Sequence, residues 1–289
     1  MIKSRLTVCI LLASCLSVFL HKPAAVFAMS WKEKDSDHFI CYYTTDDKFA
    51  KQTLDKAEDY YKQIALDLGY PRYTDFWTYD NRAKIFIYPD HASYLKAADM
   101  PEWSHGMADY NKKEIVSYLW SGEFLDSILP HETAHLIFRD FVGFTGEIPL
   151  WLDEGVAQWS ETCKRSEMKG MVYQLYEEDR LLSLEDLMKL DVRKLKKMDR
   201  VYIRATRDKE GKPAALFLST DALITNYYLV AVSVIGFLIE RYGSDRFSRF
   251  CRELRDGKEV GEALKFAYSP SIQSIEDLEV NWRQYLAEM

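Results

Sequence analysis

Two histidines and two glutamates form the pattern in this chain that is best suited to chemistry. His131 and His135 belong to a His-Glu-Thr-Ala-His run, and Glu154 follows after eighteen intervening residues. Residues four apart share one face of a helix, so both imidazoles can bind one metal ion. Glu132 then lies beside that ion, where a base for an attacking water is needed. The spacing predicts one catalytic Zn²⁺ per chain, with His131, His135 and Glu154 as ligands and Glu132 as general base.

The residues around this motif predict a buried helix that must position it. Apolar residues recur at helical spacing on both sides of the motif: Leu125, Ile128, Leu129, Leu136 and Ile137. Ionisable groups in such a helix are costly unless a cation satisfies them. Pro130 predicts either a kink or the start of the metal-binding helix. Glu154 lies in a stretch, 149–159, that is typical of a loop leading into a short amphipathic helix.

The motif and its spacing resemble those of the gluzincin zinc metallopeptidases. HETAH, eighteen residues and then Glu154 within WLDEG are similar to the branch of the aminopeptidases and leukotriene hydrolase, and to the bacterial peptidase MA-like domain. The resemblance extends over residues 38–289, with 228–243 similar to the family's late helix and 282–286 to its C-terminal helix. It implies an α+β fold in which a small N-terminal mixed sheet with helices precedes a mainly helical, thermolysin-like zincin region. It also implies hydrolysis of peptide bonds.

The same resemblance implies further site residues. A tyrosine of the late helix would stabilise the oxyanion, which points to Tyr228, with Tyr227 as the second choice and core packing as the alternative for both. An edge strand would hold the substrate backbone, or would be an ordinary hairpin strand. Its residues are Gly106, Met107, Ala108 and Asp109.

Two departures from the family pattern concern specificity and ligand orientation. The aminopeptidases carry a GAMEN-type strand whose glutamate holds the substrate amine, whereas this chain has HGMADYN, so exopeptidase and endopeptidase action both stay open. Gln158 stands four residues after Glu154, where the thermolysin-like branch has an aspartate beside a zinc histidine. Asp153 is a second candidate to orient a histidine, or it caps the helix.

The N-terminus predicts export. Lys3 and Arg5 precede an apolar run, 6–20, and small residues lead to a cleavage site after Ala28. We therefore expect a signal peptide over residues 1–28; the alternatives are a lipoprotein anchored through Cys15 and an uncleaved membrane anchor. Each alternative places the remaining chain outside the cytoplasm, and the last two tether it to a membrane.

The net charge limits the classes of partner that the chain can bind, and the cysteine content limits its disulfides. The formal net charge is −7, and residues 1–28 contain no acidic residue, so the exported part is more acidic still. An acidic chain argues against a nucleic-acid partner and gives no sign of electrostatic membrane binding. A peptide or protein substrate is what the resemblance to the gluzincins implies. Cys41, Cys163 and Cys251 are an odd number at wide spacing, which favours buried thiols over a disulfide framework, although one disulfide stays open.

Two functions are the alternatives to a peptidase. One is a catalytically silent gluzincin-fold scaffold at the cell envelope, and the other is a zinc hydrolase of other substrates.

Periodicity predicts two parts after a linker over residues 29–37: an α/β part over 38–120 and a helical part over 121–289. Strands are expected at 38–45, 84–88, 106–110 and 114–119. Helices are expected between Asp46 and Gly69 and at 91–98, 122–141, 151–161, 167–178, 184–190, 220–242, 244–255, 258–266 and 274–287. The stretch 191–213 is rich in Lys and Arg and is interpreted as a solvated loop, or as a basic rim that attracts acidic substrates.

Overall fold

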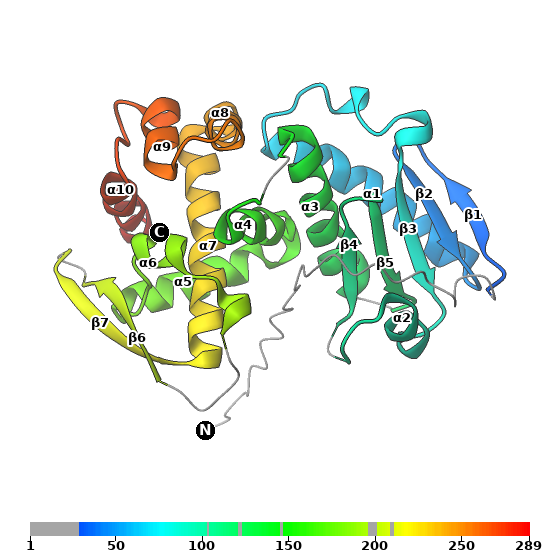
Figure 1. The fold of residues 1–289 in the computed structure, drawn as a ribbon, viewed down its shortest axis with the longest axis horizontal. Helices are drawn as coiled ribbons and strands as arrows, with labels where there is room; N and C mark the ends of the chain where they lie inside the picture. The colour runs from blue at the N-terminus through cyan, green and yellow to red at the C-terminus, as the bar shows by residue number, and fades with distance from the viewer. Residues whose placement is uncertain (1–28, 103, 121–122, 145–146, 196–200, 209–210) are drawn as a thin grey trace.

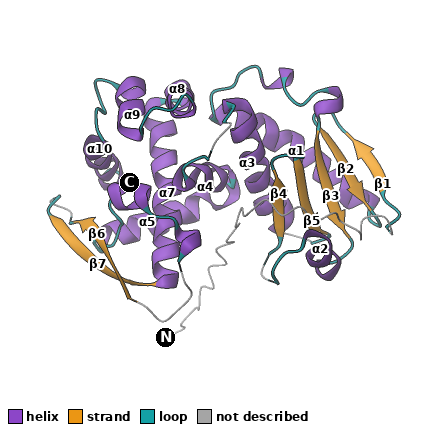
Figure 2. Cartoon of the chain, in the orientation of Figure 1, coloured by secondary structure: helices purple, strands orange, loops and turns teal. Residues whose placement is uncertain are grey.

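A five-stranded mixed sheet and a mainly helical part make up the protein, as Figures 1 and 2 show. The computed structural model describes residues 29–102, 104–120, 123–144, 147–195, 201–208 and 211–289. The expected signal peptide and Cys15 lie outside the described residues. The expectation of a mixed α+β fold with a small N-terminal sheet is confirmed.

The sheet has the order β1-β2-β3-β5-β4. Its three central strands, β2 (Phe39–Tyr43), β3 (Ala83–Tyr88) and β5 (Glu114–Tyr118), are parallel. The edge strands, β1 (Lys32–Asp35) and β4 (Gly106–Asp109), run antiparallel to their neighbours. Strand β4 therefore has a partner strand only on its β5 side within the described sheet. That edge faces α3 (Leu129–Val142) in Figure 1.

Alternating side chains place helices on both faces of this sheet. Every second residue of β2 is buried, and these residues pack with α1 (Asp47–Asp67). Helix α1 begins where predicted, because the Asp46 carboxylate accepts hydrogen bonds from the N–H groups of Lys48 and Phe49. The opposite face is covered by α2 (His91–Ala98) and by Trp31, whose ring contacts Phe86 and Tyr88 edge-on.

Strand β1 corrects the expectation of a loose linker over residues 29–37. Lys32–Asp35 pairs with β2 in antiparallel register. The four side chains of β1 are charged and three are exposed, so the strand lacks the alternation by which strands are recognised. Charged residues of this kind are typical of an edge strand that must not pair with another chain.

Helix α3 begins with a local irregularity that Pro130 explains. A single π-helical turn, Phe124–Ile128, leads directly into α3, and Pro130 occupies the first turn of α3. Proline has no N–H to donate to the carbonyl of Asp126, four residues earlier. The thiol of Cys163 donates to that carbonyl instead, at 2.9 Å. Gly143, with φ +80°, ends the helix.

The helical part is built around α7 (Thr220–Tyr242), which is mostly buried. It is long and apolar enough to cross a membrane, but 83% of its most apolar window is buried inside the protein, as in the core helix of a folded domain. The helices around it are α4 (Leu150–Ser160), α5 (Arg165–Glu177), α6 (Leu184–Lys189), α8 (Ser244–Arg255), α9 (Val260–Tyr268) and α10 (Ile275–Ala287). Single 3₁₀ turns lie at Tyr73–Asp75, Tyr79–Asn81, Thr162–Lys164 and Val192–Lys194.

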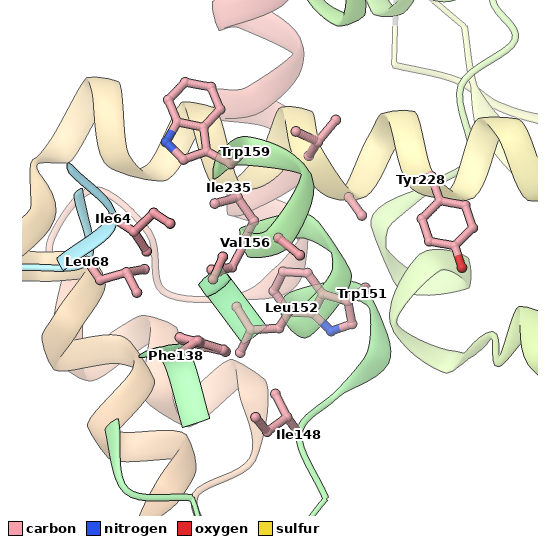
Figure 3. Close-up of a cluster of buried hydrophobic side chains, with 14 of the residues drawn as sticks. Ile64, Leu68, Phe138, Ile148, Trp151, Leu152, Val156, Trp159, Tyr228 and Ile235 are labelled. Atoms are coloured by element: carbon pink, nitrogen blue, oxygen red, sulfur yellow. The ribbon is translucent and has the colours of Figure 1, made fainter. Parts of the chain in front are cut away.

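A close crossing of α4 on α7 fixes the position of Glu154. Gly155, the next residue, has no side chain, and a Cβ there would lie 3.0 Å from the carbonyl oxygen of Ala231 and 2.8 Å from the Ile235 side chain. Figure 3 shows the apolar cluster around this crossing, in which Val156, Trp159 and Ile235 are labelled. The backbone of α4 is thus held against α7 at the residue that follows the candidate ligand.

A second correction concerns the basic stretch 191–213. Part of it forms β6 (Val201–Arg207), which pairs with β7 (Pro213–Ser219) in a separate antiparallel hairpin. The expected solvated loop is therefore partly a strand. Val201–Arg207 contains two arginines, and Thr206 is its only buried residue, so no alternation of buried apolar residues marks the strand in the sequence.

Candidate metal centre

Three predicted ligands meet in the protein interior. His131 and His135 lie one turn apart on α3, and their Nε2 atoms are 3.3 Å from each other. From α4, the Glu154 Oε2 atom lies 3.8 Å from the His131 Nε2 atom. The three possible ligand atoms lie within 4.8 Å of one another, and all three side chains are buried. The helical spacing and the α3–α4 packing together produce this cluster.

Each imidazole has a carboxylate behind it. The Nδ1 atom of His131 is 2.9 Å from Glu161 Oε1, and the Nδ1 atom of His135 is 2.9 Å from Asp153 Oδ1. A carboxylate accepts a hydrogen bond, so each Nδ1 carries the proton. In the neutral rings the two Nε2 lone pairs then point toward the same space. Carboxylate–histidine pairs of this kind orient the imidazole ligands of metals.

A buried oxygen of Glu154 without a hydrogen-bond partner indicates that the cluster suits a cation. Its Oε2 atom is fully buried and has no hydrogen-bond partner. Two nitrogen lone pairs and one such oxygen, held together in the buried interior, are unfavourable unless a positive charge lies among them. Two imidazole nitrogens and one carboxylate oxygen are the donor set of a catalytic zinc site with one open position. The residues therefore fit a zinc ion.

The surrounding charges also favour a cation. Burial disfavours the charged form of His135, but Asp153 and the glutamates nearby outweigh it and raise the pKa of His135 to about 10. For Glu161 burial is again opposed, here by His131, Lys164 and Ser127, which lower its pKa to about 2. Protons and a metal ion compete for such a site, so metal binding there releases protons.

Glu132 lies next to the three clustered side chains. It follows His131 on α3 and is buried. Its charge acts on His131, His135 and Glu154, since it contributes to the shifted pKa values of all three. The carboxylate is thus beside the cluster without being one of its three converging ligands.

Sequence reasoning missed Glu161. The sequence suggested Gln158 or Asp153 as the residue that orients a histidine. In the structure, Asp153 hydrogen-bonds to His135. Asp153 does not cap α4, since Pro149 is the N-cap residue of that helix. Glu161 lies seven residues after Glu154, two helical turns away, and so returns to the same face. Its second oxygen accepts from Ser127 at 2.6 Å and pairs with Lys164 at 2.9 Å. This spacing of two helical turns from Glu154 was the signal by which the sequence could have identified Glu161.

The structure favours Tyr227 over Tyr228 as the tyrosine near the ligands. Burial, and then the charge of Glu154, raise the pKa of Tyr227, whose hydroxyl is buried and lacks a hydrogen-bond partner. Tyr228 is also buried and its ring packs edge-on against that of Tyr227, with centroids 5.6 Å apart. Figure 3 shows Tyr228 extending from α7 beside the apolar cluster.

The expected substrate strand is the free edge of the sheet. Gly106–Asp109 is β4, and a Cβ on Gly106 would meet Ile128, just before α3. The Asp109 carboxylate accepts from the N–H groups of Asn111 and Lys112, so it holds the following turn. Tyr110, which the sequence did not single out, places its ring edge-on to His135 at 6.1 Å.

The remaining histidines and cysteines have structural contacts. His38 pairs with Glu58 at 2.7 Å, and His91 stacks on His105 with centroids 5.0 Å apart. The three cysteines of the described part are free thiols, two buried and one exposed. The disulfide alternative is therefore not realised among Cys41, Cys163 and Cys251.

Comparisons with known proteins do not identify the chain. No model of a known protein family matches it, and no curated protein matches its sequence significantly.

Proposed function

We propose that this protein is an exported zinc metallopeptidase of the gluzincin, thermolysin-like type. The observation that carries the proposal is the buried convergence of His131, His135 and Glu154. Both Nδ1 atoms are bound to carboxylates, and the inward Glu154 oxygen has no partner. The motif supports hydrolysis in particular, because Glu132 stands beside the ligands rather than among them.

The ion would supply Lewis acidity, polarising a carbonyl and making a bound water more acidic. Glu132 accepts the proton of the attacking water and returns it to the leaving amine. The hydroxyl of Tyr227, or of its neighbour Tyr228, donates a hydrogen bond to the oxyanion of the tetrahedral intermediate. The unpaired edge of β4 offers backbone N–H and C=O groups to an extended peptide.

Metal analysis tests the site itself. We expect about one zinc per wild-type chain by mass spectrometry of the purified protein, and loss of that zinc in His135→Ala and Glu154→Ala. Glu167→Ala, at an exposed position on α5, is the matched control and should keep its zinc. Zinc-free wild type after reconstitution, or zinc retained in both ligand variants, would contradict the proposed centre.

Turnover tests the reaction. Glu132→Gln preserves the shape of the side chain but removes the base, so cleavage of a broad peptide library should fall by at least about 100-fold while zinc stays bound. If wild type and variant are equally inert and both hold zinc, the chain is a silent scaffold. Turnover of esters alone, with the same dependence on Glu132, would assign the site to a hydrolase of other substrates.

A further inference from the structure

The carboxylate of Glu161 is held by two further side chains. While its Oε1 atom faces His131, its Oε2 atom accepts a hydrogen bond from Ser127 at 2.6 Å and lies 2.9 Å from Lys164 Nζ. Lys164 Nζ also donates to Ser127 Oγ at 2.6 Å. Ser127 therefore gives its only hydroxyl proton to Glu161 and accepts from Lys164 with its oxygen. The three side chains contact one another pairwise around a single carboxylate oxygen.

The spacing of Ser127 along the chain explains why it reaches Glu161. Ser127 lies four residues before His131, so both side chains leave the same side of the helical segment and can meet one carboxylate. Ser127 belongs to the π-helical turn that leads into α3, and single turns of this type occur frequently at functional sites. This turn thus carries the hydroxyl group that supports Glu161.

The segment that follows α4 is fastened to the same turn. The thiol of Cys163 donates to the Asp126 carbonyl at 2.9 Å, and Cys163 lies in the 3₁₀ turn Thr162–Lys164. That 3₁₀ turn begins directly after Glu161, so the same contact holds Lys164 close to the carboxylate. The start of α3 and the end of α4 are therefore joined at Glu161.

Burial makes these partners necessary. Glu161 is 6% exposed and Ser127 is 2% exposed, so water can replace little of what the neighbouring side chains provide. A buried carboxylate is stable only when its oxygens accept hydrogen bonds and its charge is compensated. Lys164, whose side chain is 33% exposed, supplies that charge from the surface. Without Ser127 and Lys164 the carboxylate gains by turning toward solvent, and His131 then loses its partner.

We propose that Ser127 and Lys164 are positioning residues of the candidate metal centre, which act on His131 through Glu161. The proposal rests on the proposed function, because it takes His131 as a zinc ligand. The hydrogen bonds run from Lys164 through Ser127 and Glu161 to the imidazole, and linked bonds of this kind strengthen one another. The orientation of one metal ligand thus depends on a lysine at the surface.

The zinc affinity of the purified full chain, measured by competition with a chelator, tests this role. Ser127→Ala and Lys164→Met should each lower the affinity by about 3- to 10-fold, which is less than the loss of a direct partner of the imidazole. Lys164→Arg keeps the charge and the donors and should restore most of the affinity. Lys169→Met is the matched control. Lys169 pairs with Glu240 at 2.7 Å and its side chain is 38% exposed, but it lies on α5 and its loss should leave zinc binding unchanged.

The sign of the effect at position 164 separates positioning from simple charge. Removing a positive charge near a bound cation strengthens cation binding by itself. Weaker binding in Lys164→Met therefore requires a change in the geometry of the ligands.

Two further measurements show whether both residues act through Glu161. In a Glu161→Ala background, Ser127→Ala and Lys164→Met should have no additional effect on zinc affinity, because the carboxylate that transmits their effect is gone. The visible absorption of Co²⁺ bound in place of zinc reports ligand geometry without any variant of Glu161. It should change in Ser127→Ala and Lys164→Met and not in Lys169→Met.

Four results would each overturn the proposal: wild-type affinity in both single variants, tighter binding in Lys164→Met, equal losses with and without Glu161, or an unchanged Co²⁺ spectrum. In each of these cases a wild type that binds one zinc leaves the proposed function standing. A wild type that binds no metal would overturn both.

Discussion

At the residue scale, the candidate centre depends on carboxylates that do not face the ligand space. Glu161 and Asp153 fix the tautomer of His131 and His135 from behind. They lie 30 and 18 residues from their histidines in sequence, and α4 brings them there. Outer partners of this kind control metal affinity because they decide which nitrogen is free and where it points.

Glu161→Gln should lower zinc affinity by about 10- to 100-fold, because a neutral amide orients His131 less firmly. Competition titration with a zinc chelator measures the change. Glu167→Gln on the exposed surface of α5 is the control and should bind zinc like wild type. Unchanged affinity in Glu161→Gln would show that the carboxylate is not needed to position the imidazole.

Acid should erase the effect of the same substitution on the stability of the zinc-free protein. The native pKa of Glu161 is about 2, against an ordinary value of 4.5, so the ionised carboxylate stabilises the fold above about pH 4.5. This contribution is lost as pH falls from about 4.5 toward 2. The difference in unfolding free energy between wild type and Glu161→Gln should therefore shrink over that window in denaturant titrations. A constant difference would mean that the charge of Glu161 contributes nothing.

At the element scale, the contact of α4 with α7 determines where Glu154 lies. Gly155→Ala should destabilise the protein by about 1–3 kcal/mol, because its Cβ would meet the backbone of α7 at Ala231. Denaturant unfolding measures the loss, and we also expect weaker zinc binding as α4 shifts. Gly170→Ala in α5 is the matched control.

Gly170→Ala, the control, is expected to change the free energy of unfolding in the opposite direction. A Cβ at Gly170 meets nothing within 4 Å, and the residue lies inside a helix, so alanine should stabilise by roughly 0.5–1 kcal/mol. If both substitutions changed stability equally, helix propensity rather than the close crossing would explain the result.

At the scale of the whole molecule, a bound ion would join α3 to α4 and thereby link the helix beside the sheet to the helical part. Removing it with a chelator should lower the melting temperature by roughly 5 °C or more, because a ligand that binds only the folded state stabilises it. Calorimetry with and without chelator measures the shift. His135→Ala should melt at the same temperature in both conditions, and a chelator effect of equal size there would contradict zinc as its cause.

The sequence alone determined the features that depend on local spacing. The i,i+4 pair His131 and His135 required only a helix. Apolar periodicity predicted α4 and α7 to within one residue, and it predicted one continuous helix where a π-helical turn leads into α3. Asp46 and Gly69 marked the ends of α1 through their own side-chain and backbone preferences. Each of these signals is carried by residues within a few turns of one another.

Tertiary structure alone decided the features that join distant segments. No local rule pairs Glu161 with His131, distinguishes Tyr227 from Tyr228, or places Tyr110 against His135, because each depends on how two elements pack. Strands β1, β6 and β7 were also missed. The charged side chains of β1 hide its alternation, and backbone pairing with a neighbouring strand makes all three segments strands. The exposed face of the β6–β7 hairpin exists only because that pairing aligns Ile203 with Phe217 and leaves both uncovered.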